Sequence, residues 1–339
     1  MGKRVLVIFL VTAAVAIAAL SGYWVWWAGQ LERGIAQWRE QQRARGYEIS
    51  YQGPALSGFP LAHVARFEAP SLRAPDGARW QGPAVVARAP LWDPRRIALS
   101  FPGRHLLEGA NAGAVSSVVL DSREAEAVVR VASDGRWESA EVAMRGLEIS
   151  AAQFGPIASD RLDLRLAPSY EAATGRLSGT DFAVEVVELR VPAALAEPLE
   201  PTAGRIAAAG RLDGVVPAVE PRLALAAWRD NGGALAFESL EIDWPPLGAG
   251  ATGRLVLDDR LRPQGELAAR IAGLPALLDR LAEVGRLTPQ QASNTKLAVL
   301  AFAGAPDANG RRVLAVPVIL QAGILYLGPI PLGRVSPVL

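Results

Sequence analysis

The two histidines, His63 and His105, are the side chains of this sequence best suited to acid–base or metal chemistry. Metal sites bring several His, Cys or carboxylate ligands together at typical spacings, and neither histidine has such a partner nearby in the sequence. Each follows a turn-rich stretch, Gly58-Phe59-Pro60-Leu61 or Phe101-Pro102-Gly103-Arg104. We therefore predict that both are surface or turn residues, and we expect no catalytic residues, no metal site and no cofactor.

A glycine pattern, Gly248-Ala249-Gly250-Ala251-Thr252-Gly253, has the spacing of a dinucleotide-binding loop. Such a loop joins a strand to a helix, because the helix N-terminus binds the pyrophosphate. Residues 254–257 predict a following strand instead, so no nucleotide site is assigned. The sequence has no P-loop, nucleophile elbow or Ser-x-x-Lys pattern, and we expect a protein that is not an enzyme.

The amino-acid composition excludes some classes of binding partner and some kinds of metal site. The 339 residues include 35 basic and 34 acidic side chains, and a formal charge of +1 creates no general field that would attract nucleic acid. We expect no nucleic-acid partner. The absence of cysteine excludes disulfides, iron–sulfur clusters and thiolate zinc sites.

The N-terminal segment has the properties of a membrane anchor. Residues 5–27 carry no charge, and about 20 apolar residues suffice to cross a bilayer as a helix. Lys3 and Arg4 precede this run, so the positive-inside rule predicts residues 1–4 in the cytoplasm and the bulk of the chain in the periplasm. An aromatic belt is expected at the outer interface of the inner membrane, formed by Tyr23, Trp24, Trp26 and Trp27. The lipid bilayer is therefore an expected partner.

A cleaved signal peptide is the alternative. Ala14-Val15-Ala16 and Ala16-Ile17-Ala18 match the small-x-small pattern of a cleavage site. The apolar core of a signal peptide is typically about 7 to 15 residues long, whereas this run continues into three tryptophans. Its length favours a retained anchor over residues 5–27.

The remainder is predicted to be a short helix followed by a β-rich domain. Leu31, Ile35 and Trp38 recur at helical spacing, which predicts a juxtamembrane helix over residues 28–46 that ends at Gly46. Residues 47–339 are expected to form the periplasmic domain, with a possible subdivision near residue 110.

Alternation of apolar and charged residues indicates strands with one buried face, as in Leu162, Leu164 and Leu166 and in Leu240, Ile242 and Trp244. Hairpin cues of the Asn/Asp/Gly kind separate such runs, and they are Asp134-Gly135, Asn231-Gly232-Gly233, Asp258-Asp259 and Asn309-Gly310. We predict antiparallel β-meanders.

The dipeptide Gly-Arg recurs nine times, and its glycines are Gly103, Gly135, Gly175, Gly204, Gly210, Gly253, Gly285, Gly310 and Gly333. Turn chemistry explains this recurrence if Gly makes each turn and Arg begins a solvated strand. A degenerate repeat of β-hairpins is the alternative.

A helical hairpin interrupts the strands. Its first helix is predicted from one apolar stripe, formed by Leu274, Leu277, Leu278, Leu281 and Val284, and it ends at Gly285. Thr288, Pro289 and Gln291 predict an N-cap, a first-turn proline and a capping-box partner for a second helix. The expected fold is mainly β, of the α+β class, with this hairpin packed on the sheet.

Several short motifs together resemble the bacterial domain-of-unknown-function family numbered 2125. They are Leu56-Ser57-Gly58-Phe59-Pro60, Ala89-Pro90-Leu91-Trp92-Asp93-Pro94, Gly253-Arg254-Leu255, Arg262-Pro263-Gln264-Gly265 and Leu327-Gly328-Pro329-Ile330-Pro331-Leu332. Gly58, Phe59, Pro60 and Trp92 are the turn residues that carry the first two. The resemblance implies an inner-membrane anchor and a periplasmic β domain, with no established catalytic residues.

The chain also resembles, more loosely, the AsmA-like envelope proteins, and that likeness implies a β groove associated with phospholipid handling. A sheet face that is wholly apolar must be covered by another sheet, by helices or by a lipid. If a groove for lipid or another apolar ligand exists, its candidate lining residues are Leu240, Ile242, Leu255 and Leu257. They fit a packed core equally well.

Three functions remain open at this point. The first is a non-enzymatic, membrane-anchored envelope protein that binds lipid or another apolar ligand. A structural scaffold for envelope protein partners is the alternative. The second alternative is a hydrolase of unrecognised type, with His63 or His105 at its centre.

Overall fold

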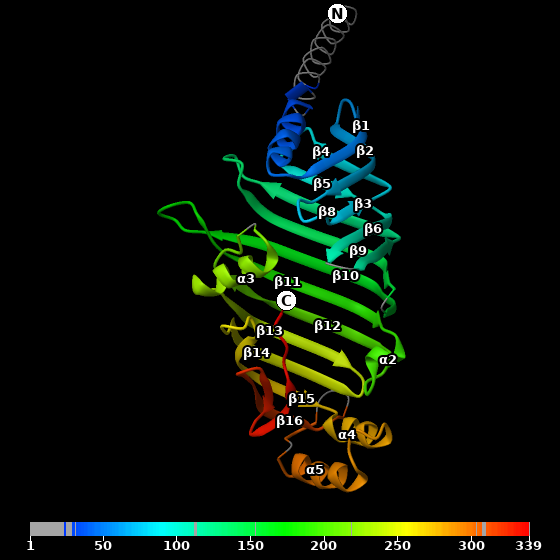
Figure 1. Ribbon diagram of the computed structural model, residues 1–339, viewed down its shortest axis with the longest axis vertical. Helices are drawn as coiled ribbons and strands as arrows, with labels where there is room; N and C mark the ends of the chain where they lie inside the picture. The colour runs from blue at the N-terminus through cyan, green and yellow to red at the C-terminus, as the bar shows by residue number, and fades with distance from the viewer. Residues whose placement is uncertain are drawn as a thin grey trace, which may run out of the picture. The chain divides into compact units, whose positions relative to one another are not determined.

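A computed structural model describes residues 24, 29–30, 32–111, 114–152, 154–217, 219–302, 304–306 and 310–338 (Figure 1). The predicted anchor, with Lys3, Arg4, Tyr23, Trp26 and Trp27, lies outside these residues, and only Trp24 of the predicted belt is among them. Within the described part of the chain, no helix combines the length and the hydropathy needed to cross a membrane.

The chain forms two compact units. Unit 1 comprises residues 1–137 and 149–153, and unit 2 comprises residues 138–148 and 154–339. The division falls within strand β9 (Trp137–Ala151). A boundary between folding domains near residue 110 stays a prediction.

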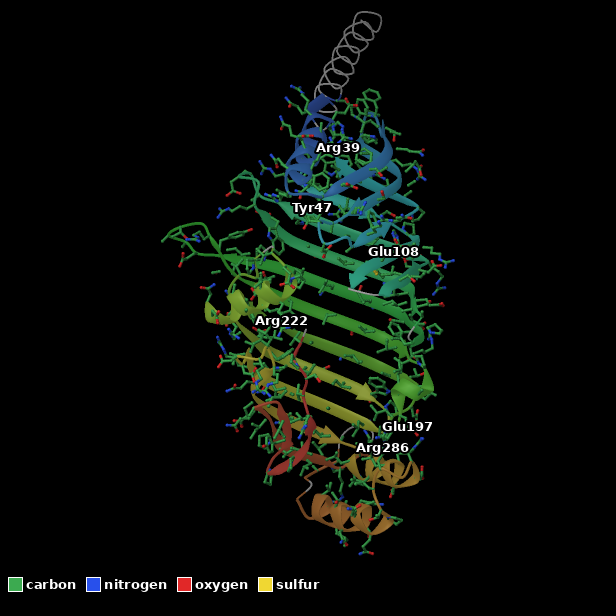
Figure 2. The ribbon with its side chains drawn as sticks, in the orientation of Figure 1. Arg39, Tyr47, Glu108, Glu197, Arg222 and Arg286 are labelled. Carbon is green, nitrogen blue, oxygen red and sulfur yellow. The ribbon has the colours of Figure 1, made fainter. Side chains whose placement is uncertain are left out.

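Unit 1 begins with a helix over residues 32–44, which stops at Gly46 because that residue adopts a φ of +86°. Arg39 of this helix lies 5.8 Å from the centre of the Tyr51 ring, and Figure 2 labels Arg39 beside the first strands. A cation over an aromatic ring is attracted by the ring quadrupole. This contact ties the helix to the sheet that follows.

The sheet of unit 1 does not follow sequence order. Its antiparallel pairs are β1–β2, β2–β3, β2–β4, β3–β6, β4–β5, β5–β8 and β6–β7. The strands are β1 (Glu48–Ser57), β2 (Ala62–Arg73), β3 (Arg79–Gln81), β4 (Ala84–Pro90), β5 (Arg96–Ser100), β6 (Gly103–Asn111), β7 (Ala114–Ser122) and β8 (Glu124–Val131).

Unit 2 is a meander in which each strand from β10 to β18 pairs antiparallel with the next, as predicted (Figure 1). β9 also pairs with β10. The strands are β10 (Phe154–Tyr170), β11 (Leu177–Arg190), β12 (Thr202–Asp213), β13 (Ala234–Trp244), β14 (Leu247–Leu257), β15 (Pro263–Ala272), β16 (Val313–Gln321), β17 (Ile324–Leu327) and β18 (Ile330–Arg334). The glycine pattern at 248–253 lies inside β14, in a strand and not in a loop before a helix.

The predicted helical hairpin is present as α4 (Leu274–Glu283) and α5 (Pro289–Phe302). Its capping box is confirmed, because Thr288 N donates to Gln291 Oε1 at 2.9 Å and Gln291 N donates to Thr288 Oγ1 at 3.2 Å. Lys296 of α5 also binds Asp279 of α4 at 2.9 Å.

Two further helices were not predicted, α2 (Ala193–Ala196) and α3 (Pro221–Asp230). Asn231-Gly232-Gly233, interpreted as a hairpin cue, follows the end of α3 instead. The available signal was Glu220-Pro221, since the Glu220 carboxylate accepts from Arg222 N and Leu223 N. Trp228 fixes α3 to β12 by donating its Nε1 hydrogen to Asp213 O at 2.8 Å.

The Gly-Arg dipeptide has no constant structural position. Gly135 and Gly175 lie in turns with positive φ, whereas Gly204, Gly210 and Gly253 lie inside strands. Neither turn chemistry nor a hairpin repeat explains every occurrence.

Candidate ligand-binding face

One face of the unit 2 sheet is apolar along four rows of directly paired residues, and we call it the apolar face. Residues in register on antiparallel strands share a face of the sheet. The rows are Leu162–Val186–Ile206–Ile242–Ala249–Ile271–Leu314, Leu164–Val184–Ala208–Leu240–Ala251–Ala269–Val316, Leu166–Phe182–Gly210–Phe237–Gly253–Leu267–Val318 and Pro168–Thr180–Leu212–Leu235–Leu255–Gly265–Leu320. Thr180 carries the one side-chain hydroxyl among them.

The four residues proposed as groove lining lie on this face. Leu240, Ile242 and Leu255 belong to three of the rows, and Leu257 follows Leu255 on the same side of β14. Strand pairing therefore brings together side chains that sequence separates by up to 17 positions.

A β-bulge keeps β13 in phase with its neighbours. The pairing shifts between Phe237 and Leu240, so Leu235 and Phe237 before the bulge and Leu240 and Ile242 after it occupy the same face. Without the extra residue, half of the strand would turn its apolar side chains to the other face.

Gly210 lies between the two members of an aromatic pair on the apolar face. It lies in register between Phe182 and Phe237, whose ring centroids are 6.1 Å apart at an interplanar angle of 88°. This edge-to-face geometry is favourable for aromatic rings. A side chain at Gly210 would occupy the space between the strands.

Much of the apolar face is only half-buried. Its leucine, isoleucine and valine side chains are of intermediate exposure, with the exception of Leu267, which is buried. Of the residues that the structure describes, no large side chain is less than 2 % exposed, and the buried apolar residues are mostly alanines. Every described strand of unit 2 belongs to one continuous sheet, and no separate second sheet occurs among these strands.

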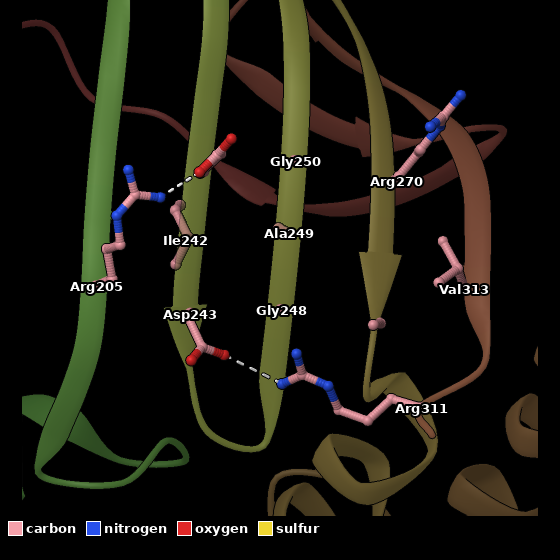
Figure 3. Close-up of a pocket in the computed structure, with 11 residues that line it drawn as sticks. Arg205, Ile242, Asp243, Gly248, Ala249, Gly250, Arg270, Arg311 and Val313 are labelled. Carbon is pink, nitrogen blue, oxygen red and sulfur yellow. Dashed lines mark hydrogen bonds and ion pairs between the residues drawn. The ribbon is translucent and has the colours of Figure 1, made fainter. Parts of the chain in front are cut away.

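The C-terminal strands provide partial cover. In Figure 3 they pass behind β13 to β15, on the side away from the charged residues that are drawn. Val338 N donates to Leu261 O at 3.0 Å, and Leu261 and Leu267 are among the few large buried residues. This contact holds the end of the described chain against the turn between β14 and β15.

The opposite face of the same sheet is charged, and we call it the polar face. Arg205 of β12 lies between two carboxylates, donating to Glu185 at 2.7 Å and to Glu241 on the other side. The hydrogen bond from Arg205 holds the pKa of Glu185 below its ordinary value, although partial burial works in the opposite direction. Alternation along each strand thus separates an ionic surface from an apolar one.

A shallow pocket of about 320 Å³ lies on the polar face (Figure 3). Arg311 closes one end by binding Asp243 at 3.2 Å, and Arg205 binds Glu241 at the other. Arg270 also lines it and has no ion-pair partner within the described residues. The lining contains no histidine, hydroxyl or thiol, so this pocket offers charge recognition rather than a nucleophile.

The prediction that both histidines are surface or turn residues is wrong. His63 lies in β2 and His105 in β6, and they are 4 % and 3 % exposed. His105 stacks on Trp80 at 5.8 Å between ring centroids, and its Nε2 lies 2.7 Å from Phe101 O. Burial lowers the pKa of His63, which favours its neutral form. No cluster of metal-ligating side chains occurs in the part of the chain that the structure describes.

The family-motif residues form two adjoining turns of unit 1. Gly58, with a φ of +94°, Phe59 and Pro60 connect β1 to β2, and Trp92 lies between β4 and β5. Leu91 N donates to Leu61 O at 3.0 Å, which joins the two turns. Trp24 reaches the same place, because its Nε1 donates to Ala62 O at 3.1 Å.

Comparison with known proteins gives one match. No curated protein and no solved structure matches the chain significantly. The family model described as "Uncharacterized protein conserved in bacteria (DUF2125)" matches residues 24–336, which include most of each unit and the two motif turns. The chain belongs to this bacterial family, DUF2125.

Proposed function

We propose that the protein is a non-enzymatic, membrane-anchored envelope protein whose apolar face binds the acyl chains of a lipid. The observation that carries this proposal is the set of four apolar rows, most of whose large side chains remain half-exposed. Leaving large apolar surface in water is unfavourable by roughly 25 cal/mol per Å². An occupant that shields it would be stabilised by the same effect.

The dimensions of the apolar face suit an extended hydrocarbon chain. Each row crosses from β10 to β16, and strands lie about 4.8 Å apart, so a row is on the order of 29 Å long. Burial contributes about 0.8 kcal/mol for each methylene group. A long acyl chain lying across the strands would therefore be held without polar contacts.

The proposed location is the inner membrane, with both units in the periplasm. The uncharged run over residues 5–27, preceded by Lys3 and Arg4, supports a single-pass anchor in that orientation. Such an anchor would hold the apolar face close to the bilayer and give it access to membrane lipid.

Photo-crosslinking at adjacent residues of β13 tests the proposal. Leu240 and Glu241 are neighbours in sequence, yet they lie on the apolar and the polar face. Benzoylphenylalanine is introduced in place of one or the other in the full chain, in cells whose phospholipids carry ³²P. After irradiation we expect a radiolabelled adduct from position 240 and little or none from position 241.

Equal labelling at the two positions, or none at either, would remove the lipid proposal. The same experiment distinguishes the scaffold alternative, for which a specific observation exists. Val215, Val216 and Val219 precede α3, Leu223 lies in its first turn, and all four are exposed apolar residues that a protein partner would cover. A protein adduct at position 240 without lipid would favour the scaffold.

A further inference from the structure

The two motif turns of unit 1 carry the most exposed cluster of large apolar side chains near Trp24. Phe59 is 49 % exposed, Leu61 is 62 % exposed and Trp92 is 74 % exposed. We call these three residues the turn cluster. The backbone bond between Leu91 N and Leu61 O and the pairing of Ala62 with Pro90 place their turns side by side.

The turn that carries Phe59 and Leu61 is held firmly. Leu61 N and Ala62 N both donate to Gly58 O, at 3.1 and 2.9 Å. Gly58 has a φ of +94°, and a side chain there would come within 2.7 Å of Ala62 O. The turn therefore presents its apolar side chains on a defined backbone, which need not be ordered when they bind.

Trp24 connects this cluster to the uncharged N-terminal run. Its ring meets Phe59 edge to face at 6.0 Å and stacks on His63 at 5.5 Å, in addition to the hydrogen bond with Ala62 O. Trp24 stands near the end of the run over residues 5–27. If that run crosses a bilayer, Trp24 and the turn cluster fixed to it lie at the level of the lipid headgroups.

We propose that the turn cluster, Phe59, Leu61 and Trp92, inserts into the headgroup region of the membrane and docks unit 1 on the bilayer. Tryptophan and other aromatic side chains favour this region, because one part of it is apolar and the other is wet. Arg95, three residues after Trp92, is exposed and has no ion-pair partner within the described residues, so it is available to anionic headgroups. The inference rests on the membrane location in the proposed function and not on lipid binding by the apolar face.

The chain contains no cysteine, so one introduced cysteine can be labelled specifically to test this docking. An environment-sensitive fluorophore is attached to Leu61→Cys, to Trp92→Cys or to Leu107→Cys in the full chain. Leu107 is the matched control, since it is 40 % exposed on β6 of the same unit and lies outside both turns. Each protein is reconstituted into vesicles of phosphatidylethanolamine and phosphatidylglycerol, with and without a lipid that bears a nitroxide near its headgroup.

We expect blue-shifted emission and several-fold stronger nitroxide quenching at positions 61 and 92 than at position 107. Equal quenching at all three positions would overturn the proposal. Protection of positions 61 and 92 from aqueous iodide without nitroxide quenching would overturn it as well and would indicate a protein partner. Far-UV circular dichroism confirms that each labelled chain is folded. The crosslinking at Leu240 can fail while these labels report docking, so the two proposals are separable.

Discussion

On the polar face, charged residues of neighbouring strands change the pKa of a carboxylate between them. Glu185 accepts a hydrogen bond from Arg205 of β12 at 2.7 Å, and an Arg161 nitrogen of β10 lies 4.0 Å away. Both arginines favour the charged carboxylate, Arg205 the more strongly, and the pKa of Glu185 is lowered. These side chains are partly exposed, so such pairs contribute about 0 to 1 kcal/mol each.

This pair predicts a pH-dependent effect of Glu185→Gln. Because the folded state lowers the pKa of Glu185 below its ordinary value of 4.5, the stabilisation is present above pH 4.5 and is lost as the pH falls through the folded-state pKa. We expect the variant to lower the free energy of unfolding by up to about 1 kcal/mol at neutral pH and to have no effect in strong acid. Urea unfolding at the two pH values measures this difference.

Glu141→Gln is the matched control, since Glu141 is an exposed carboxylate of β9 without an ion-pair partner among the described residues. It should leave the unfolding free energy nearly unchanged at both pH values. A loss of stability for Glu185→Gln that persisted in strong acid would show that packing, and not charge, is responsible.

The two histidines show that the neighbouring sequence does not predict whether a single residue is buried. His63 and His105 follow Pro- and Gly-rich stretches, and that neighbourhood predicted exposure. The strands place them instead against Trp24 and Trp80, which no spacing in the sequence indicates. Their buried positions arise from contacts between residues 25 to 39 positions apart.

At the scale of elements, the close approach of β12 to β13 requires a glycine at position 210. A Cβ atom at Gly210 would overlap the carbonyl oxygen of Ala236 on the neighbouring strand. Gly210→Ala should therefore lower the free energy of unfolding by about 1 to 3 kcal/mol, as overpacking does elsewhere. The midpoint of thermal or urea unfolding measures this effect.

Gly250→Ala in β14 provides the comparison for Gly210→Ala. A Cβ atom at Gly250 would approach no heavy atom more closely than 3.9 Å. This variant should be neutral or more stable by about 0.4 to 1 kcal/mol, because alanine restricts the unfolded chain. If the two variants were equally stable, the interpretation of Gly210 as a packing requirement would be wrong.

Lipid binding belongs to the scale of several elements, because no strand forms the apolar face alone. Leu240 becomes part of a row only through its pairing with Ala208 on one side and Ala251 on the other. The adjacent Glu241 points to the polar face, which is why those two positions discriminate between lipid contact and general proximity to a membrane.

At the scale of the whole molecule, the prediction concerns anchoring in the membrane by residues 5–27. We expect the full chain to remain in the membrane pellet after alkaline carbonate extraction, because residues 5–27 are long enough to span the bilayer. The double variant Val15→Arg and Ala18→Arg should move to the supernatant, since charges at the centre of a spanning helix cost about 2.5 to 3.5 kcal/mol each. Immunoblotting of the two fractions measures the distribution.

Mass spectrometry of the mature N-terminus accompanies this extraction. A terminus near Ala19, together with release of the unmodified chain by carbonate, would contradict a retained anchor and support a cleaved signal peptide.

The sequence by itself determined the features that depend on near neighbours. Period-two alternation predicted antiparallel strands, and the apolar stripe with Thr288 and Gln291 predicted the helical hairpin and its capping box. Short motifs such as Gly58-Phe59-Pro60 were enough to indicate the family. The helix α3 was missed although Glu220 and Pro221 signalled its start, because strands dominated the surrounding pattern.

Only the tertiary structure decided which residues meet. The register of seven strands assembles the apolar rows, and the bulge in β13 keeps Phe237 and Leu240 on the same side. Alternation along one strand is the same whether a second sheet, a helix or a lipid covers the face. The half-burial of this face was decided by the tertiary structure, because burial depends on what packs from outside the strand.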